Sequence, residues 1–236
     1  MSNLRVNFSY PIAVFDTETG GLEPDPVIDW DLTTDVSKPG QKVEGKVKIP
    51  AAPILELAAV ILDPVSLEEI SSFHTYCGPA EGETVAQLLD RCSPEALEVN
   101  GFDSGKRREA LKTAPSQKAA LQSWVDWLIT NTDSRGRYPK KFIPCGQNVR
   151  FDINMLNSSF RRAGIDFQLK SQPLELIGFS MLYFGLPNTG SVARYSLEVV
   201  AQALGISIDD AHTALADVRM TAKCLKTYVK AFTSGV

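Results

Sequence analysis

The order of strand-like and helix-like segments constrains the fold of this chain more than any other feature. Apolar or alternating runs typical of β-strands come first, at residues 11–16, 54–63 and 69–77. The short links favour antiparallel neighbours, although one long segment separates the first run from the second. A fourth apolar run, at residues 141–145, follows much later and is typical of a buried strand.

Helical patterns dominate the chain after the third strand. Ser116 is suited to cap a helix that continues to about residue 131, and Gly164 suits the position just after a helix over residues 149–162. Further helices are expected at residues 83–91, 94–99, 174–184, 196–204 and 213–232. We therefore predict an α/β fold with a mixed central sheet of about five strands, the first three antiparallel, flanked by helices.

The bulk composition is that of an ordinary globular protein. The 236 residues are 44% hydrophobic and 22% charged, which favours a single domain with a sizeable core. We find no targeting or membrane segment, because the longest apolar run is too short to span a bilayer. The four cysteines form no C-x-x-C pair, so we interpret them as reduced thiols and expect a cytoplasmic protein.

The net charge of −4 argues against an extended nucleic-acid-binding surface, which is usually basic. It is compatible with an enzyme that grips only the end of a strand, where phosphate contacts are few and bound metal ions supply positive charge. Local basic clusters lie at residues 106–108 and 135–141.

Two carboxylates end the first predicted strand, in the sequence Asp16-Thr17-Glu18. Residues i and i+2 of a strand point to the same side, so both carboxylates should face one way. Carboxylates held this close repel each other unless a cation lies between them, and their hard oxygens favour Mg²⁺ or Mn²⁺. A D-x-E pair by itself is more often a surface acidic pair.

Three later residues complete a candidate site. Asp152 follows a buried strand and opens a helix, where a carboxylate complementing the helix dipole is the common alternative. His212 and Asp217 are five residues apart, which is about 500° of rotation on an α-helix and leaves their side chains about 140° apart. They can act together only if a helix begins at or just after His212. The other histidine, His74, is expected to be structural.

The three segments in this order resemble the DEDDh 3′→5′ exonucleases, the proofreading-exonuclease and ribonuclease T-like branch of the ribonuclease H-like fold. Residues 15–22 (FDTETGGL) are similar to the first motif of that family, and residues 54–60 (ILELAAV) to its second strand. Residues 93–101 and 195–198 resemble its substrate-side segment and the helix before its last motif. The resemblance covers most of the chain except residues 23–53.

The resemblance implies a two-metal mechanism. Asp16, Glu18, Asp152 and Asp217 would hold two Mg²⁺ ions about 3.5–4 Å apart, with Mn²⁺ able to substitute. His212 would be the general base that accepts a proton from the attacking water. The expected reaction is release of nucleoside 5′-monophosphates from a single-stranded 3′ end.

The resemblance also implies substrate contacts at Thr19, Leu22, Glu95 and Asn100. Ribonuclease T-like members place aromatic rings at the wedge positions, whereas Leu22 and Val99 are aliphatic here. The oligoribonuclease branch carries Met where this chain has Thr19. Both departures favour DNA over RNA as the substrate. An RNA 3′-end-trimming enzyme and a non-catalytic polymerase-accessory module are the alternatives.

The expected organisation is a single exonuclease domain over residues 1–236 with an insertion at about 24–52. A stand-alone enzyme is expected, and a non-covalent contact with a polymerase or a second copy of the chain stays open. Residues 41–49 are expected to form a small hairpin that turns at Gly45. The insertion is interpreted either as a lid or partner contact at the rim of the site, or as a tolerated surface loop.

Overall fold

The computed structural model describes residues 6–29, 46–132, 141–169, 172–187, 189–207 and 213–234. Its centre is a five-stranded mixed sheet with the strand order β5-β4-β1-β6-β7. This confirms the predicted fold class. The strands are β1 (Ile12–Thr19), β4 (Ile54–Leu62), β5 (Glu69–Tyr76), β6 (Ile143–Gly146) and β7 (Leu174–Glu175).

The strand pairing agrees with the predicted antiparallel start of the sheet. β1 is antiparallel to β4, with Ile12 opposite Leu62 and Glu18 opposite Glu56, and β4 is antiparallel to β5. β6 is parallel to β1, but their register ends at the pair Val14 and Cys145. The far end of β1 therefore extends beyond its parallel neighbour.

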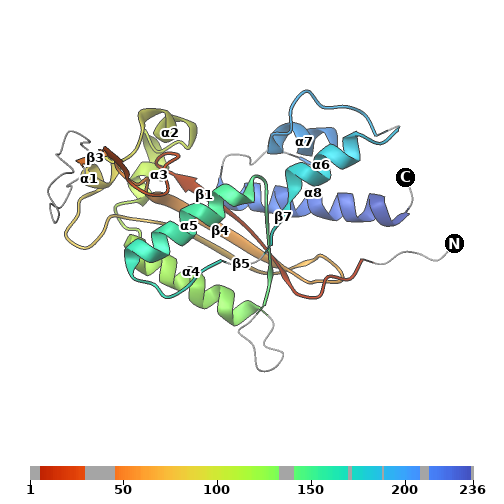
Figure 1. Ribbon diagram of the computed structural model, residues 1–236, viewed down its shortest axis with the longest axis horizontal. Helices are drawn as coiled ribbons and strands as arrows, with labels where there is room; N and C mark the ends of the chain where they lie inside the picture. Colours follow the sequence, from red (N-terminus) through yellow and green to blue (C-terminus); the bar gives the residue numbers. More distant parts are fainter. Residues whose placement is uncertain are drawn as a thin grey trace, which may run out of the picture.

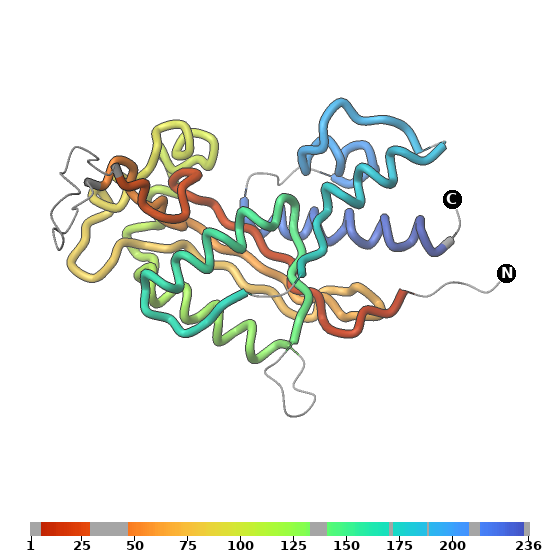
Figure 2. The backbone as a smooth tube through the Cα atoms, viewed as in Figure 1, coloured from red at the N-terminus to blue at the C-terminus, as the bar shows by residue number. Residues whose placement is uncertain are grey.

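Helices cover both faces of the sheet (Figure 1). The helix α5 lies beside α4 in one group, whereas α6, α7 and α8 gather in another, a grouping that the backbone trace repeats (Figure 2). None of the described helices is both long and apolar enough to cross a membrane. The helices are α1 (Val85–Leu89), α2 (Pro94–Val99), α3 (Gly105–Ala110), α4 (Gln117–Asn131), α5 (Val149–Ala163), α6 (Leu176–Phe184), α7 (Leu197–Ala203) and α8 (Ala214–Ser234).

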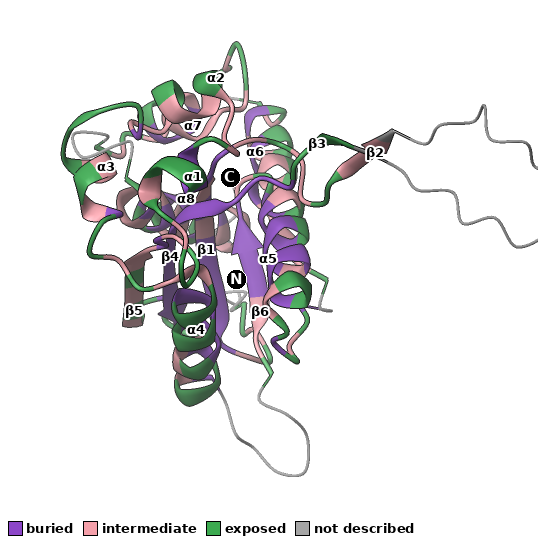
Figure 3. Ribbon diagram, turned by 90° about the vertical axis from the view of Figure 1, so that its left-hand side faces the viewer, coloured by how far each residue is buried: buried purple, intermediate pink, exposed green. Residues whose placement is uncertain are grey.

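Alternation along β1 divides the core into two layers. Ala13 and Phe15 pack with residues of α4 and α5, and the Phe15 ring meets the Trp124 ring edge-on at 5.7 Å. Ile12 and Val14 belong to the opposite cluster, with residues of α6, α7 and α8. Buried central strands between partly exposed helices are visible in Figure 3. Even-numbered residues of β1 therefore face α8, and odd-numbered residues face α5.

Local capping explains where several helices begin and end. The Ser116 hydroxyl accepts a hydrogen bond from the Ala119 amide, and Gly164 adopts a left-handed conformation with φ of 67°, as predicted for both. The helix expected from residue 174 is preceded by the two residues of β7. The short helix α3 was not predicted, because its six residues carry little apolar periodicity.

The expected insertion leaves and returns at adjacent points of the backbone. The Ala52 amide donates to the Glu23 carbonyl at 2.8 Å, and the Gly20 amide donates to the Pro53 carbonyl at 2.8 Å. Between them, β2 (Val27–Asp29) pairs with β3 (Lys46–Ile49) in a ribbon that projects from the body (Figure 3). The hairpin expected within residues 41–49 lies partly outside the described residues, and the partner that the structure gives β3 is β2. Alternation identified the strand but not its partner, and Gly45 lies outside the described residues.

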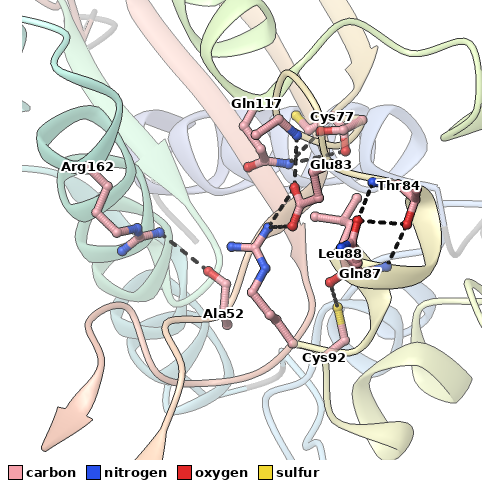
Figure 4. A network of polar contacts seen from close by, with 12 residues as sticks. Ala52, Cys77, Glu83, Thr84, Gln87, Leu88, Cys92, Gln117 and Arg162 are labelled. Atoms are coloured by element: carbon pink, nitrogen blue, oxygen red, sulfur yellow. Dashed lines mark hydrogen bonds and ion pairs between the residues drawn. The ribbon is translucent and has the colours of Figure 1, made fainter. Parts of the chain in front are cut away.

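Polar contacts fasten this segment to α5. The Asp25 carboxylate accepts hydrogen bonds from the Ser158 hydroxyl and from Arg161, the latter at 2.8 Å, and these bonds lower its pKa. Arg162 donates to the Ala52 carbonyl at 3.5 Å (Figure 4). The same view shows Gln117 at the start of α4, whose side-chain amide donates to the Cys77 carbonyl at 3.2 Å. The connections around the end of β1 are thus tied to helices of one layer.

Candidate active site

The end of β1 and the first turn of α8 bring three carboxylates together. Asp16 and Glu18 both point toward α8, as predicted from their i, i+2 spacing. Asp217 lies in the first turn of α8. Each of the three residues offers an oxygen, and these atoms all lie within 4.8 Å of one another. We call this group the acidic triad.

The start of α8 has the geometry that the sequence required. The helix begins at Ala214, and the hydroxyl of Thr213 accepts a hydrogen bond from the Ala216 amide at 3.3 Å. The Asp217 amide donates to the Thr213 carbonyl at 3.0 Å, so Asp217 lies inside the helix. His212, the predicted general base, lies outside the described residues. A helix therefore does begin between His212 and Asp217.

Asp152 reaches the site from the opposite layer. Because pairing with β6 stops at Val14, the Thr17 amide has no partner strand on that side. The Asp152 Oδ1 atom accepts hydrogen bonds from the Thr17 amide at 2.9 Å and from the Thr17 hydroxyl at 2.7 Å. Asp152 is therefore hydrogen-bonded to the end of β1. A carboxylate that only complemented the helix dipole would not make these bonds.

All four predicted carboxylates line one pocket of about 290 Å³. The remaining lining comes from β1, from the end of α2, from the loop between β6 and α5, and from the starts of α5 and α7. Among these residues, Asn148 adopts a left-handed backbone conformation with φ of 58°. The lining residues not predicted from the sequence are Thr17, Gln147, Asn148, Phe151, Leu197 and Glu198.

Burial dominates the electrostatics of the site. Burial and the neighbouring charges of Asp152 and Glu18 raise the pKa of Asp16 well above its usual value. Burial raises the pKa of Glu18 to about 7, against the opposing charge of Arg107. Burial also raises the pKa of Asp152 to about 7, against the hydrogen bonds from Thr17. Buried carboxylates that destabilise one another's charge fit a divalent cation with a preference for oxygen ligands.

Three further residues next to the triad were not predicted as part of the site. Glu56 lies directly opposite Glu18 in the sheet and is fully buried. It accepts hydrogen bonds from His74 Nε2 at 2.7 Å and from the Arg107 guanidinium, which also lies 3.5 Å from Glu18 Oε1. A lone charge within an apolar strand was the signal for Glu56. Arg107 gave no signal beyond its basic cluster.

The residues predicted to touch substrate are placed unequally. Leu22 is 78% exposed and does not line the pocket, whereas Val99 is 77% exposed and does line it. Asn100 lines the pocket, and its side-chain amide donates to the Thr19 carbonyl at 2.9 Å. The buried Thr19 hydroxyl donates to the Gly21 carbonyl at 2.8 Å. Glu95 is exposed in the first turn of α2 and does not line the pocket.

Comparison with known proteins gives one family match. A family model described as "Exonuclease", of the RNase T type, matches residues 13–225. A search of the curated proteins found no match.

Solved structures of exonuclease I share the fold. An E. coli exonuclease I complex with single-stranded DNA and zinc is 19% identical, with a TM-score of 0.64 over 94% of this chain and 41% of that chain. The E. coli enzyme with a dT13 oligonucleotide is 19% identical, with a TM-score of 0.60 over 92% and 40%. Exonuclease I from Methylocaldum szegediense is 16% identical, with a TM-score of 0.63 over 94% and 40%. The chain thus spans about two fifths of the length of these proteins.

Proposed function

Since this chain belongs to the exonuclease family, we propose that it is a metal-dependent 3′→5′ exonuclease that releases nucleoside 5′-monophosphates from single-stranded 3′ ends. The observation that carries the proposal is the convergence of Asp16, Glu18, Asp152 and Asp217 in one pocket. These carboxylates come from β1, α5 and α8, which are far apart in the sequence. A non-catalytic module would have no need to retain all four acidic side chains.

Asp16, Glu18, Asp152 and Asp217 are the residues that would hold two Mg²⁺ ions, or Mn²⁺ in their place. The fit rests on the spacing of the acidic triad, whose residues are half-buried, and on the raised pKa of Asp16. Divalent ions held there supply Lewis-acid activation of water and neutralise charge on the scissile phosphate. Asp152 belongs to α5, and hydrogen bonds from the amide and hydroxyl of Thr17 hold its carboxylate in place.

His212 is the proposed general base that accepts the proton of the attacking water. A histidine side chain suits proton transfer near neutral pH. The start of α8 at Ala214 supports this role, because it separates the His212 position from the helical turn that carries Asp217.

Two exposed apolar side chains, which we call the apolar rim, support a strand-end substrate: Val99 lines the pocket, and Leu22 follows the end of β1 that carries Glu18. The apolar side chains of Leu22 and Val99 are exposed, so the protein itself does not bury them. A terminal base of the substrate would cover them. Asn100 contributes by holding the Thr19 carbonyl, so Thr19 would meet the terminal nucleotide through its backbone. Glu95 would contact substrate from outside the pocket. Aliphatic rather than aromatic rim residues favour DNA, and the E. coli relative was solved with single-stranded DNA.

Partners beyond the strand end are also proposed. A polymerase or a second copy of this chain are the candidate protein partners. A cytoplasmic location is proposed from the four cysteines, which are all free thiols. The single domain over residues 1–236, with its insertion at 24–52, is supported by the adjacent backbone positions of Glu23 and Ala52.

A degradation assay across substrate classes tests the proposed function. Single- and double-stranded DNA and RNA, labelled at the 5′ end, are incubated with protein and Mg²⁺, and the products are resolved by length. We expect a ladder that shortens from the 3′ end, fastest on single-stranded DNA. Faster loss of RNA would favour the 3′-end-trimming alternative, and no degradation of any substrate would contradict the proposal.

Replacing residues 25–48 by a short Gly-Ser linker tests the role of the insertion. A weaker affinity for single-stranded DNA with an unchanged melting temperature would support a substrate-contacting lid. Unchanged affinity would support a tolerated surface insertion.

A further inference from the structure

A fifth carboxylate, Glu56, lies beside the acidic triad without belonging to it. Strand pairing sets it directly opposite Glu18, so both side chains project from the same face of the sheet. Carboxylates directly opposite each other on neighbouring strands are destabilising, more so when one of them has no exposed surface. The fold therefore has to neutralise Glu56, or Glu56 would compete for a cation bound next to Glu18.

Both oxygens of Glu56 are engaged by neighbouring side chains. Oε1 contacts His74 Nε2 at 2.7 Å, and Oε2 accepts a hydrogen bond from the Arg107 guanidinium. His74 comes from β5 and Arg107 from α3, so the carboxylate is held from two sides. These two contacts hold the Glu56 carboxylate away from the neighbouring carboxylates that are proposed to bind metal.

Arg107 itself is held in a defined position. Its guanidinium lies 4.6 Å from the centroid of the Phe102 ring, and Phe102 is fully buried. The Tyr76 ring meets the Phe102 ring edge-on at 6.1 Å, which supports this platform from β5. From there Arg107 reaches Glu18 Oε1 at 3.5 Å as well as Glu56. One fixed cation thus bridges a carboxylate inside the triad and a carboxylate outside it.

We propose that Arg107 is a positioning residue for the metal centre. It orients the Glu18 carboxylate toward Asp16 and Asp217, and its hydrogen bond to Glu56 holds that carboxylate away from them. The inference rests on the proposed function, since it concerns the ligands of the same metal ions. Arg107 touches no reacting atom in this scheme. Its effect passes through Glu18.

Two physical effects oppose each other at this position. The positive charge of Arg107 disfavours a second cation nearby, whereas its contact with Glu18 restricts that side chain to one orientation. The loss of a residue that orients a metal ligand typically costs about 10–100-fold in metal affinity or activity. We therefore expect orientation to outweigh repulsion, so that removing Arg107 weakens metal binding.

Calorimetric titration with Mn²⁺, without nucleic acid, separates these effects. We expect Arg107→Met to bind Mn²⁺ at least about tenfold more weakly than the unmodified protein. Arg108→Met is the matched control, because Arg108 lies on the same helix but donates to the Asp103 carbonyl. It should bind Mn²⁺ normally, and so should Glu56→Gln, since Glu56 is not a ligand. Equal or tighter binding by Arg107→Met would overturn the inference.

A double variant distinguishes positioning from simple support of the fold. In Arg107→Met with Glu56→Gln, the buried charge that needed Arg107 is removed, so the melting temperature should recover toward that of the unmodified protein. Mn²⁺ binding should stay weak, because no guanidinium restricts the orientation of the Glu18 side chain. Recovery of both quantities would show that Arg107 does not position Glu18. If the unmodified protein binds no Mn²⁺, the proposed function itself fails, which is a different result.

Discussion

The two hydrogen bonds from Thr17 to Asp152 Oδ1, at 2.9 Å and 2.7 Å, join the two layers of the fold at the candidate metal centre. They exist because β6 stops pairing with β1 at Val14, which leaves the Thr17 amide without a strand partner. Thr17 points toward α5, while its neighbours Asp16 and Glu18 point toward α8. Residues 16–18 of β1 thus bring together carboxylates that lie on both faces of the sheet.

Replacing the Thr17 hydroxyl tests this link. Thr17→Val keeps the shape and the amide bond but removes the 2.7 Å hydrogen bond to Asp152. A hydrogen bond to a charged group contributes about 1.5–3 kcal/mol, so we expect about a tenfold or greater fall in kcat. Steady-state kinetics on a single-stranded oligonucleotide measure it. Thr75→Val is the control, since the Thr75 hydroxyl donates only to the Tyr76 carbonyl. An undiminished kcat in Thr17→Val would contradict the positioning role.

Proton release on metal binding follows from the raised pKa values. Glu18 and Asp152 have pKa values of about 7 without metal, so below that pH a bound ion must displace protons. Titrations in buffers of different ionisation enthalpy should show more protons released about one pH unit below 7 than about two units above it. Equal release at both pH values would count against these shifts.

The same groups give a stability prediction with a definite sign. A folded-state pKa above the unfolded value means that the folded protein holds more protons, so these carboxylates make unfolding easier as pH rises. For Glu18 the window runs from the ordinary value of 4.5 to about 7. The metal-free melting temperature should fall across this window less steeply in Glu18→Gln than in the unmodified protein. Parallel melting curves for the two proteins would contradict it.

The apolar rim offers a test of substrate contact. Leu22→Ala and Val99→Ala remove exposed side chains, so neither should change the free energy of unfolding by more than about 0.5 kcal/mol. Both should raise KM for single-stranded DNA severalfold. Val65→Ala provides a comparison, because Val65 is 61% exposed and follows the end of β4 that pairs with Ile12, at the opposite end of β1 from Glu18. Identical KM values for all three variants would remove the rim from the substrate site.

Core packing behind Asp152 should dominate stability. Phe160 is fully buried on α5 and stacks on Trp124 at 5.9 Å. Truncation of such a side chain costs about 3–5 kcal/mol, so Phe160→Ala should strongly lower the urea midpoint. Asp25→Ala breaks exposed ion pairs with Arg161 and Arg162 of the same helix and one hydrogen bond from Ser158, so it should cost less than Phe160→Ala, about 1–2 kcal/mol. A larger loss in Asp25→Ala than in Phe160→Ala would contradict this ranking.

Local periodicity was enough to predict most of the fold. The three antiparallel strands, the Ser116 cap and the end of α5 at Gly164 all depend on neighbouring residues, which the sequence displays directly. The partner of β3 could not be predicted, because alternation fixes which side chains share a face but not which strand lies alongside. The short helix α3 lacks a pattern long enough to recognise.

The candidate site was predictable where motifs and spacing carried it. Asp16 and Glu18 follow from strand geometry, and Asp217 from the need for a helix start. The contact between Glu56 and Arg107 joins residues 51 positions apart, beside the small hydrophobic cluster that contains Phe102. Local sequence spacing therefore could not predict it. The same holds for Thr17 and Asp152, which are 135 positions apart and meet only because β6 ends early.

The most direct measurement is mononucleotide release from a 5′-labelled single-stranded oligonucleotide by the unmodified protein, Asp16→Asn and Asp152→Asn, with Mg²⁺ and with a chelator. We predict shortening from the 3′ end and release of nucleoside 5′-monophosphates by the unmodified protein with Mg²⁺ alone. Both variants should keep their melting temperature or raise it, because each loses a buried charge, and should release no nucleotide. Activity in either folded variant, or activity that survives the chelator, would contradict a carboxylate-held metal centre.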